Sequence, residues 1–229
     1  ISASGVVLKG LVLDGGISQQ TAIGVGSVGN LEVRNCTFRN LQTGIWIGSS
    51  SDAMNVLVAN NIFENVRDYG IDNETGDNAS VYFRCLAIGN RFTFDFGTDS
   101  SWTAFYAPSR KGNMAFFNSF ENCEEHMAIK TTNVNDFYLN AEDNYWGDED
   151  VQESYIQAFC SPQVDFVPWS FAEAVGHTDY QLVIPDGSPS VFDVGASEGI
   201  SLSIETITTA PPTGLPIALA AYGDQSPRA

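Results

Sequence analysis

The stretch Asn61-Ile62-Phe63 is one copy of a triplet in which asparagine and a large aromatic residue flank a variable position. The further copies are Asn90-Arg91-Phe92, Asn118-Ser119-Phe120 and Asn144-Tyr145-Trp146, preceded by an altered copy, Cys36-Thr37-Phe38, and by Asp14-Gly15-Gly16 at the place of a still earlier one. Their first members lie at 14, 36, 61, 90, 118 and 144, so the steps are 22, 25, 29, 28 and 26 residues. Repetition at a period of about 20–50 residues indicates a solenoid, because each unit buries its apolar face only against its neighbours.

The residues before each triplet alternate with a period of two, which is typical of strands with one buried face. Three residues before the triplet the side chain is always apolar, as Val33, Val58, Ala87, Ala115 and Ala141. Five residues before it the members are Leu31, Val56, Cys85, Asn113 and Leu139, so only Asn113 interrupts that apolar column. Stacked coils place equivalent residues about 4.8 Å apart. We therefore expect the asparagines to form an internal hydrogen-bonded ladder and the aromatic residues to form a column in the core.

Several of these stretches together resemble the right-handed parallel β-helix, or pectate-lyase-like, superfamily. They are Val33-Arg34-Asn35-Cys36-Thr37-Phe38, Val58-Ala59-Asn60-Asn61-Ile62-Phe63, the pairs Gly44-Ile45 and Gly70-Ile71, and the closing Asn144-Tyr145-Trp146-Gly147. The resemblance covers roughly residues 5–170 and implies an all-β, right-handed parallel β-helix, here of about six coils. Lyases, hydrolases, epimerases, phage tailspikes and adhesins all use this fold, so the resemblance predicts a fold and leaves the function open.

Two further segments follow the repeats. Residues Val151 to Phe159 have helical spacing, with Asp148 or Asp150 as the expected N-cap, and such a helix would cap the open end of the stack. Residues 178–229 are poor in aromatic residues, rich in Ser, Thr, Gly and Pro, and contain alternating runs typical of two to four antiparallel strands. We expect a parallel β-helix over residues 1–170 and a small β appendage over 171–229. The appendage could be a packing hairpin, a small sandwich or an assembly arm.

The charge distribution limits the possible partners. The chain has 10 Lys and Arg against 28 Asp and Glu, and no Lys or Arg lies between Thr131 and Pro227. Such an acidic chain is a poor partner for nucleic acid or for an anionic membrane surface. In addition, no apolar run reaches the roughly 18 residues that a membrane span requires.

A candidate binding face lies on the strand that carries the Gly-Ile pairs, since the resembling family places ligands and catalytic groups on the outer face of that strand. If Ile45, Ile71, Phe105 and Ile129 point inward, alternation directs their successors outward, namely Trp46, Asp72, Tyr106 and Lys130. Four stacked positions would form a groove floor about 15 Å long. Exposed aromatic residues beside a carboxylate suit a sugar ring, whose apolar face stacks while its hydroxyls form hydrogen bonds. We therefore predict carbohydrate binding at these four residues.

The same face could also carry catalysis, with Asp72, Tyr106 and Lys130 as candidates. A lyase would use Tyr106 or Lys130 as base, together with a cation such as Ca²⁺ that neutralises the uronate carboxylate. A hydrolase would need two carboxylates about 5–9.5 Å apart, for which Asp72 could pair with Asp68 or Asp95. The calcium and base signatures of pectate lyases are not recognisable in the chain. A separate acidic cluster could hold Ca²⁺ through its oxygen atoms, and its members are Asp143, Asp148, Glu149 and Asp150.

Two classes of function remain open. The first is a secreted or cell-surface module with a structural, adhesive or assembly role, which contacts polysaccharide without altering it and associates with copies of itself. The second is a polysaccharide lyase, hydrolase or epimerase that acts on the outer face of the Gly-Ile strand. The small number of coils, the absence of an evident catalytic set in the sequence and the appended strands favour the first class.

Overall fold

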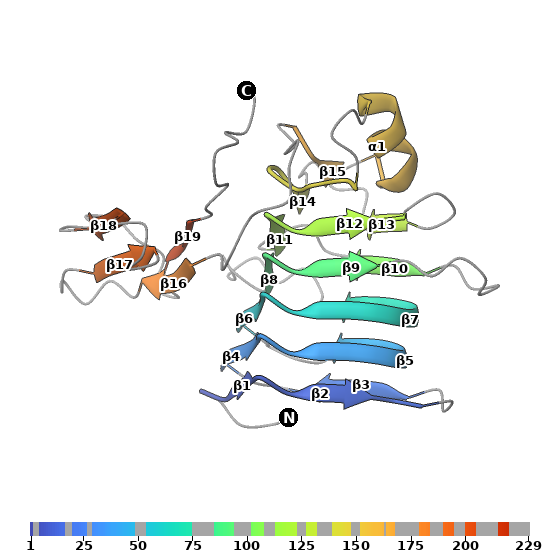
Figure 1. Ribbon diagram of the computed structural model, residues 1–229, viewed down its shortest axis with the longest axis horizontal. Helices are drawn as coiled ribbons and strands as arrows, with labels where there is room; N and C mark the ends of the chain where they lie inside the picture. Colours follow the sequence, from blue (N-terminus) through green and yellow to red (C-terminus); the bar gives the residue numbers. More distant parts are fainter. Residues whose placement is uncertain are drawn as a thin grey trace.

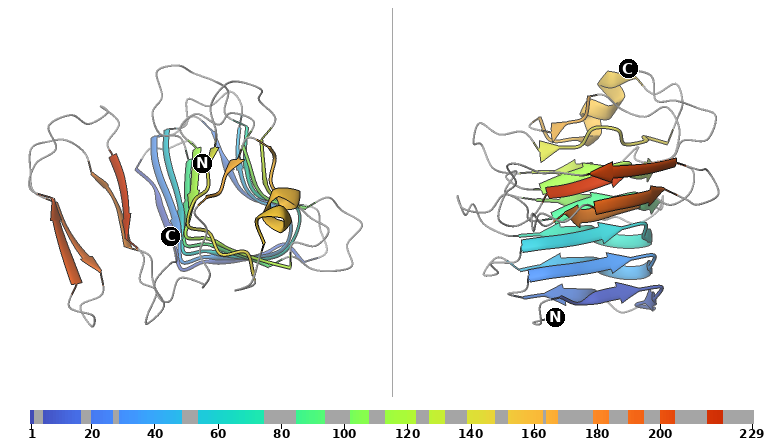
Figure 2. Two further views of the ribbon diagram at one scale, coloured as in Figure 1. Left: turned by 90° about the horizontal axis from the view of Figure 1, so that it is seen from above. Right: turned by 90° about the vertical axis from the view of Figure 1, so that its left-hand side faces the viewer.

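A computed structural model describes residues 1, 5–16, 20–26, 29–48, 54–74, 85–93, 102–107, 113–122, 127–131, 139–147, 152–162, 164–167, 179–183, 190–194, 200–204 and 215–219. Two sheets of parallel strands run along a stack of coils, as Figure 1 shows from the side and the left view of Figure 2 shows along the stack. The seven-stranded sheet consists of β1 (Val7–Lys9), β4 (Gly29–Arg34), β6 (Met54–Ala59), β8 (Cys85–Ile88), β11 (Asn113–Phe116), β14 (Leu139–Asn140) and β15 (Val164–Asp165). The eight-stranded sheet consists of β2 (Val12–Asp14), β3 (Thr21–Val25), β5 (Thr37–Ile47), β7 (Ile62–Asn73), β9 (Arg91–Thr93), β10 (Thr103–Tyr106), β12 (Ser119–Glu121) and β13 (Met127–Lys130).

The coils form a parallel solenoid, as the sequence predicts. The stack spans about four turns, counted from β2 and β3 in the first coil to β12 and β13 in the fifth. Of a sixth coil, the described residues contain one strand, β14, and two isolated bridges, from Ser119 to Tyr145 and from Ile129 to Cys160, while β15 pairs with β14 at the position of the next coil. The expected six coils are therefore slightly too many. The reason is that the chain continues from the sixth ladder turn toward a helix.

The register of the first coil differs from the expectation. The sequence placed Asp14 at the ladder position, but β2 pairs with β5 so that Val12 lies beside Thr37 and Asp14 beside Arg39. The residue equivalent to Cys36 is therefore Leu11, whose carbonyl oxygen accepts a hydrogen bond from the backbone N–H of Thr37 at 2.8 Å. With this correction the first step of the repeat is 25 residues, from 11 to 36, equal to the second.

A left-handed backbone conformation explains why the correct register starts at Leu11. In every coil the residue directly before the ladder position has a positive φ, and these residues are Gly10, Asn35, Asn60, Gly89, Phe117 and Asp143, with φ between 52° and 67°. Glycine and asparagine tolerate this conformation better than most residues. The chain thus turns from one sheet to the other in the same way in each coil, and Gly10 marks that turn in the first coil.

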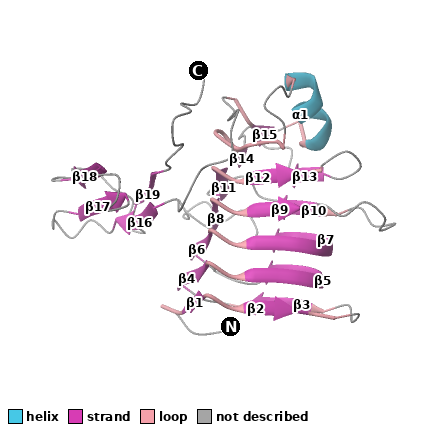
Figure 3. Ribbon diagram, viewed as in Figure 1, coloured by secondary structure: helices cyan, strands magenta, loops and turns pink. Residues whose placement is uncertain are grey.

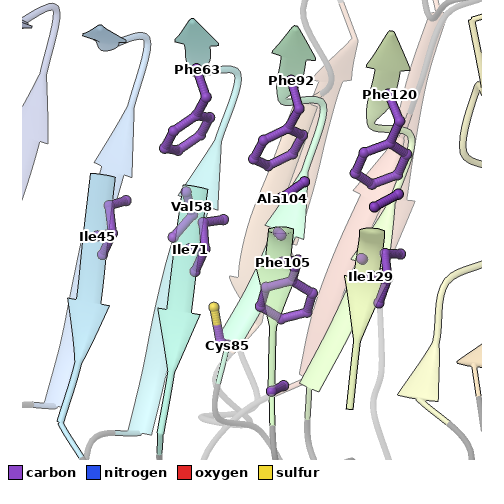
Figure 4. Packing of buried hydrophobic residues seen from close by; sticks show 14 of the residues in the cluster. Ile45, Val58, Phe63, Ile71, Cys85, Phe92, Ala104, Phe105, Phe120 and Ile129 are labelled. Carbon is purple, nitrogen blue, oxygen red and sulfur yellow. The ribbon is translucent and has the colours of Figure 1, made fainter. Parts of the chain in front are cut away.

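The expected aromatic column is present in the core. Phe38, Phe63 and Phe92 stack with ring centroids 4.7 Å apart at each step, and the column continues through Phe120 to Trp146 at 5.3 and 4.9 Å. Figure 4 shows Phe63, Phe92 and Phe120 of this column beside a second one, in which Ile71, Phe105 and Ile129 follow one another. The Gly44 backbone lies under the column, because a Cβ there would meet Phe63 at 2.8 Å and the carbonyl oxygen of Gly70 at 2.6 Å. This close approach explains the glycine of the Gly-Ile pairs.

The asparagine ladder is also present, with Asn61, Asn90, Asn118 and Asn144 all at most 1% exposed. Each Oδ1 accepts a hydrogen bond from the backbone N–H of the preceding ladder residue, at 2.8–3.0 Å. Each Nδ2 donates to a carbonyl oxygen of the preceding coil, namely that of Val33, Val58, Ala87 or Ala115. A buried amide is stable only when its hydrogen bonds are made, and this ladder makes them. Asn113, which interrupts the apolar column, is buried too, and its Oδ1 accepts from Nδ2 of Asn73 at 2.7 Å.

A short helix, α1 (Glu153–Phe159), follows the last ladder turn, as expected. Its N-cap is Gln152, with no side-chain hydrogen bond at the cap, so the expectation of Asp148 or Asp150 as N-cap is wrong. Ile156 of α1 is fully buried, and Cys160 just after it forms a bridge with Ile129 of β13. The helix therefore covers one side of the stack at its C-terminal end, where Figure 3 shows it in cyan.

Four described strands follow the stack. β16 (Asp179–Val183) pairs antiparallel with β19 (Leu215–Leu219), and β17 (Ser190–Val194) pairs antiparallel with β18 (Ile200–Ile204). Figure 1 shows them to one side of the coils. The antiparallel pairing agrees with the expected appendage. The division of the chain at residue 170, and the choice between hairpin, sandwich and assembly arm, stay predictions.

Candidate functional site

The four candidate residues lie side by side on neighbouring strands. Trp46 of β5 pairs with Asp72 of β7, Asp72 pairs with Tyr106 of β10, and Tyr106 pairs with Lys130 of β13. We refer to Trp46, Asp72, Tyr106 and Lys130 as the outer row. Three steps of strand spacing make this row about 14 Å long. The alignment agrees with the alternation in the sequence, because Ile45, Ile71, Phe105 and Ile129 are the fully buried residues directly before the four.

The depths of the four side chains differ. Trp46 is 40% exposed, and Tyr106 and Lys130 are half-buried. Asp72, by contrast, is only 7% exposed. Alternation alone does not predict this depth, because it gives the direction of a side chain and not how closely its neighbours cover it. The outer row is therefore a line of accessible side chains with a carboxyl group sunk between two aromatic residues.

The environment of Asp72 disfavours its charge. Burial, and then the negative charges of Glu74 and Asp68, together raise the pKa of Asp72 to about 7. Among the described residues, Oδ1 of Asp72 is buried without a hydrogen-bond partner. A buried carboxylate without a donor is costly, so the group holds its proton close to neutral pH.

Other polar and aromatic side chains complete the surroundings of Asp72. Nε2 of Gln42 donates to Oδ2 of Asp68 at 2.6 Å, and Nε1 of Trp46 donates to Oε2 of Glu74 at 3.2 Å. Tyr69 packs against Tyr106 with ring centroids 5.3 Å apart. Burial raises the pKa of Tyr69, and the nearby charge of Asp72 is the next cause.

Sequence reasoning missed Gln42, Tyr69 and Glu74 as members of this face. Glu74 could have been found, since it lies two residues beyond Asp72 and alternation places it on the same side. Tyr69 could not, because it lies three residues before Asp72 and strict alternation places it on the opposite side. Leu41 pairs with Val66, but Thr43 pairs with Tyr69, so β7 has one extra residue there. Such a β-bulge redirects the side chains around it.

The comparison with known families agrees with this architecture. Residues 3–92 match the model of the right-handed β-helix region. The chain is a right-handed parallel β-helix. The match over residues 3–92 and the stacked topology together support assignment to this superfamily, without indicating a specific member. No curated protein matches the chain, and no solved structure matches it.

The other predicted site residues of the β-helix lie partly outside the described ranges. Asp148, Glu149 and Asp150 of the predicted Ca²⁺ cluster fall there, as does Asp95, the second expected partner of Asp72 in a hydrolase. Asp143 is described, and it is the positive-φ residue before Asn144. Burial, and then the charge of Glu142, raise the pKa of Asp143. Within the described ranges no group of three or more His, Cys, Asp or Glu side chains could hold a metal ion, and the Ca²⁺ site stays a prediction.

The β-helix also has no described helix that could cross a membrane, α1 being only seven residues long.

Proposed function

We propose that this β-helix is a secreted or cell-surface module that holds a glycan along its outer row. The observation that supports the proposal best is the order of side chains on adjacent coils, with Trp46 and Tyr106 on either side of Asp72. Aromatic faces stack on the apolar faces of sugar rings, while a carboxyl group between them forms hydrogen bonds to hydroxyls. A row about 14 Å long, by strand spacing, extends over several rings of a linear glycan.

The solenoid favours such binding because it holds the row in place before the glycan arrives. The backbone of each outer-row residue is part of a strand that pairs with the next coil. Ordering flexible side chains or loops costs affinity, and a preformed row lowers that cost. A preformed row favours glycan binding equally whether the module mediates adhesion or attaches several copies of the chain to one polysaccharide.

A binding experiment with matched aromatic variants tests the proposal. Soluble oligosaccharides of neutral, amino and acidic sugars are titrated against the wild type, Trp46→Ala and Tyr155→Ala by calorimetry. Tyr155 is a fitting control, because it is an exposed aromatic residue on α1 with 38% exposure, close to the 40% of Trp46. We expect at least one oligosaccharide to bind the wild type and Tyr155→Ala equally and Trp46→Ala at least about tenfold more weakly, which is about 1.4 kcal/mol. Equal loss in both variants, or no binding by the wild type, would contradict the proposal.

A polysaccharide-active enzyme is the second candidate, and the state of Asp72 is the observation that favours it. A carboxyl group with a pKa of about 7 can donate a proton to a leaving group at neutral pH, as a general acid does. Asp68 is close enough to raise that pKa and could serve as the second carboxylate of a hydrolase. Release of reducing or unsaturated ends from a polysaccharide panel, with and without Ca²⁺, tests this candidate. If the wild type releases such ends and Asp72→Asn does not, the protein is an enzyme and the proposal of a binding module is wrong.

Self-association and location are tested separately. Light scattering of the full chain and of a variant that ends at residue 170 would measure whether 171–229 mediate assembly. Fractionation of producing cells would test the extracellular or surface location that a glycan-holding role requires.

A further inference from the structure

The charges around Asp72 determine which sugars the outer face can accept. Asp68 and Glu74 are both close enough to raise the pKa of Asp72, so three carboxyl groups share this part of the surface. In the outer row the one basic side chain is Lys130, which lies beyond Tyr106 as seen from Asp72. Two strand steps, about 10 Å, separate the two backbones. Among the described residues, no ion pair involves Asp72.

Hydrogen bonding distinguishes Asp72 from its two acidic neighbours. Asp68 accepts a hydrogen bond from Gln42, and Glu74 accepts one from Trp46. Oδ1 of Asp72, at 7% exposure of the whole residue, has no donor within the described part of the chain. A buried oxygen without a donor loses its hydration and gains nothing in exchange. A ligand that brings a positive charge to the exposed part of Asp72 would stabilise the ionised carboxylate and offset the repulsion among the three carboxyl groups.

The aromatic residues around Asp72 suit the same kind of ligand. Trp46 and Tyr106 flank Asp72 on the adjacent strands, and Tyr69 packs on Tyr106. Aromatic faces attract cations, most strongly where the cation is partly removed from water. Carboxyl groups surrounded by aromatic rings therefore form a favourable environment for an ammonium group. The same surroundings repel a uronate, whose carboxylate would add a further negative charge.

We propose that the outer face binds a glycan of amino sugars with free amines, with one ammonium group at Asp72 between Trp46 and Tyr106. The inference rests on the proposed function and specifies its ligand class. Hydroxyl groups of the neighbouring rings lie along Tyr106 toward Lys130. An acetylated amine lacks the charge, and a polyuronate has the opposite one, so both bind more weakly than the free amine.

Three oligosaccharides of equal length test the ligand class, namely tetramers of glucosamine, N-acetylglucosamine and galacturonic acid. Calorimetry is performed without Ca²⁺ at about pH 6.5, below the pKa of about 8 of an ordinary α-amine. We expect the glucosamine tetramer to bind at least about tenfold more tightly than the other two, a difference of about 1.4 kcal/mol. Asp72→Asn should remove this preference. Glu64→Gln, which removes an exposed carboxylate from the same strand, should retain it.

A charge variant at the other end of the row gives a second measurement that does not depend on Asp72→Asn folding. Lys130→Ala removes a positive charge, so it should tighten or preserve binding of the glucosamine tetramer and weaken any binding of the galacturonate tetramer. Equal or tighter binding of the acetylated or acidic tetramer would overturn the inference and leave the glycan-holding function intact. Absence of binding by all three tetramers and by the wider panel would overturn the glycan-holding function itself.

Discussion

Removal of one rung from the asparagine ladder should destabilise the stack by a predictable amount. Asn90 is 1% exposed, and its Oδ1 accepts hydrogen bonds from the backbone N–H and from Nδ2 of Asn61, both at 3.0 Å. Its Nδ2 donates to the carbonyl oxygen of Val58 at 2.8 Å and to Oδ1 of Asn118 at 3.0 Å. In Asn90→Ala the buried N–H of Asn61 loses the acceptor on Asn90 and the Val58 carbonyl loses one donor. At about 1–3 kcal/mol for each of these two buried groups, the expected loss is about 2–6 kcal/mol.

Urea unfolding followed by circular dichroism and by tryptophan fluorescence measures this loss. Because solenoids can unfold in parts, hydrogen exchange of the segment that contains Asn61 serves as a local measurement of the same effect. Asn140→Ala is the matched control, since Asn140 is half-buried and, among the described residues, its side chain bonds to Glu142 two residues away. The control should change the free energy of unfolding by less than about 1 kcal/mol. If Asn90→Ala changed it as little as the control does, the ladder would not stabilise the stack.

Two further variants test the core and the outer row. Phe120→Ala should lower the free energy of unfolding by about 3–5 kcal/mol in the same urea experiment, because Phe120 is fully buried between Phe92 and Trp146. A loss below about 1 kcal/mol would show that the aromatic column does not stabilise the fold. Asp72 has a pKa of about 7 in the folded chain against an ordinary value of 3.8, so its ionisation removes stability as the pH rises through that range. Asp72→Asn should therefore leave the free energy of unfolding nearly unchanged at about pH 4 and raise it by about 1 kcal/mol or more at about pH 8, and an equal effect at both pH values would refute the assigned environment.

Much of the fold could be predicted from the sequence because the repeat is visible at several positions at once. The aromatic residues recur from Phe38 to Trp146 and the asparagines from Asn61 to Asn144, and the apolar column before them excludes a chance match. The predicted register of the first coil, with Asp14 at the ladder position, was wrong for a physical reason. Leu11 neither continues the ladder nor has an aromatic residue two positions later, and Asp14-Gly15-Gly16 imitates a turn. The backbone resolves the register, since Gly10 has the positive φ that precedes every ladder residue.

The outer row is harder to recognise, because its residues are not evenly spaced along the chain. From 46 to 72, 106 and 130 the steps are 26, 34 and 24 residues, so a search for a fixed period would not connect them. The strands keep their register although the lengths of chain between these residues differ. The ladder determines the position of each coil, and only these positions show that the four residues are neighbours.

The depth of Asp72 depends on parts of the chain that no local pattern connects to it. Burial raises its pKa most, and the charges of Glu74 and Asp68 raise it in the same direction. The register between β5 and β7 shifts by one residue between Val66 and Tyr69, and the alternation of residues does not reveal that shift. The same carboxyl group on a flat, solvated strand would be an ordinary surface anion. Its chemistry therefore arises from the stacking of coils, and a β-helix with the same outer row in another loop environment need not share the preference for ammonium that we propose.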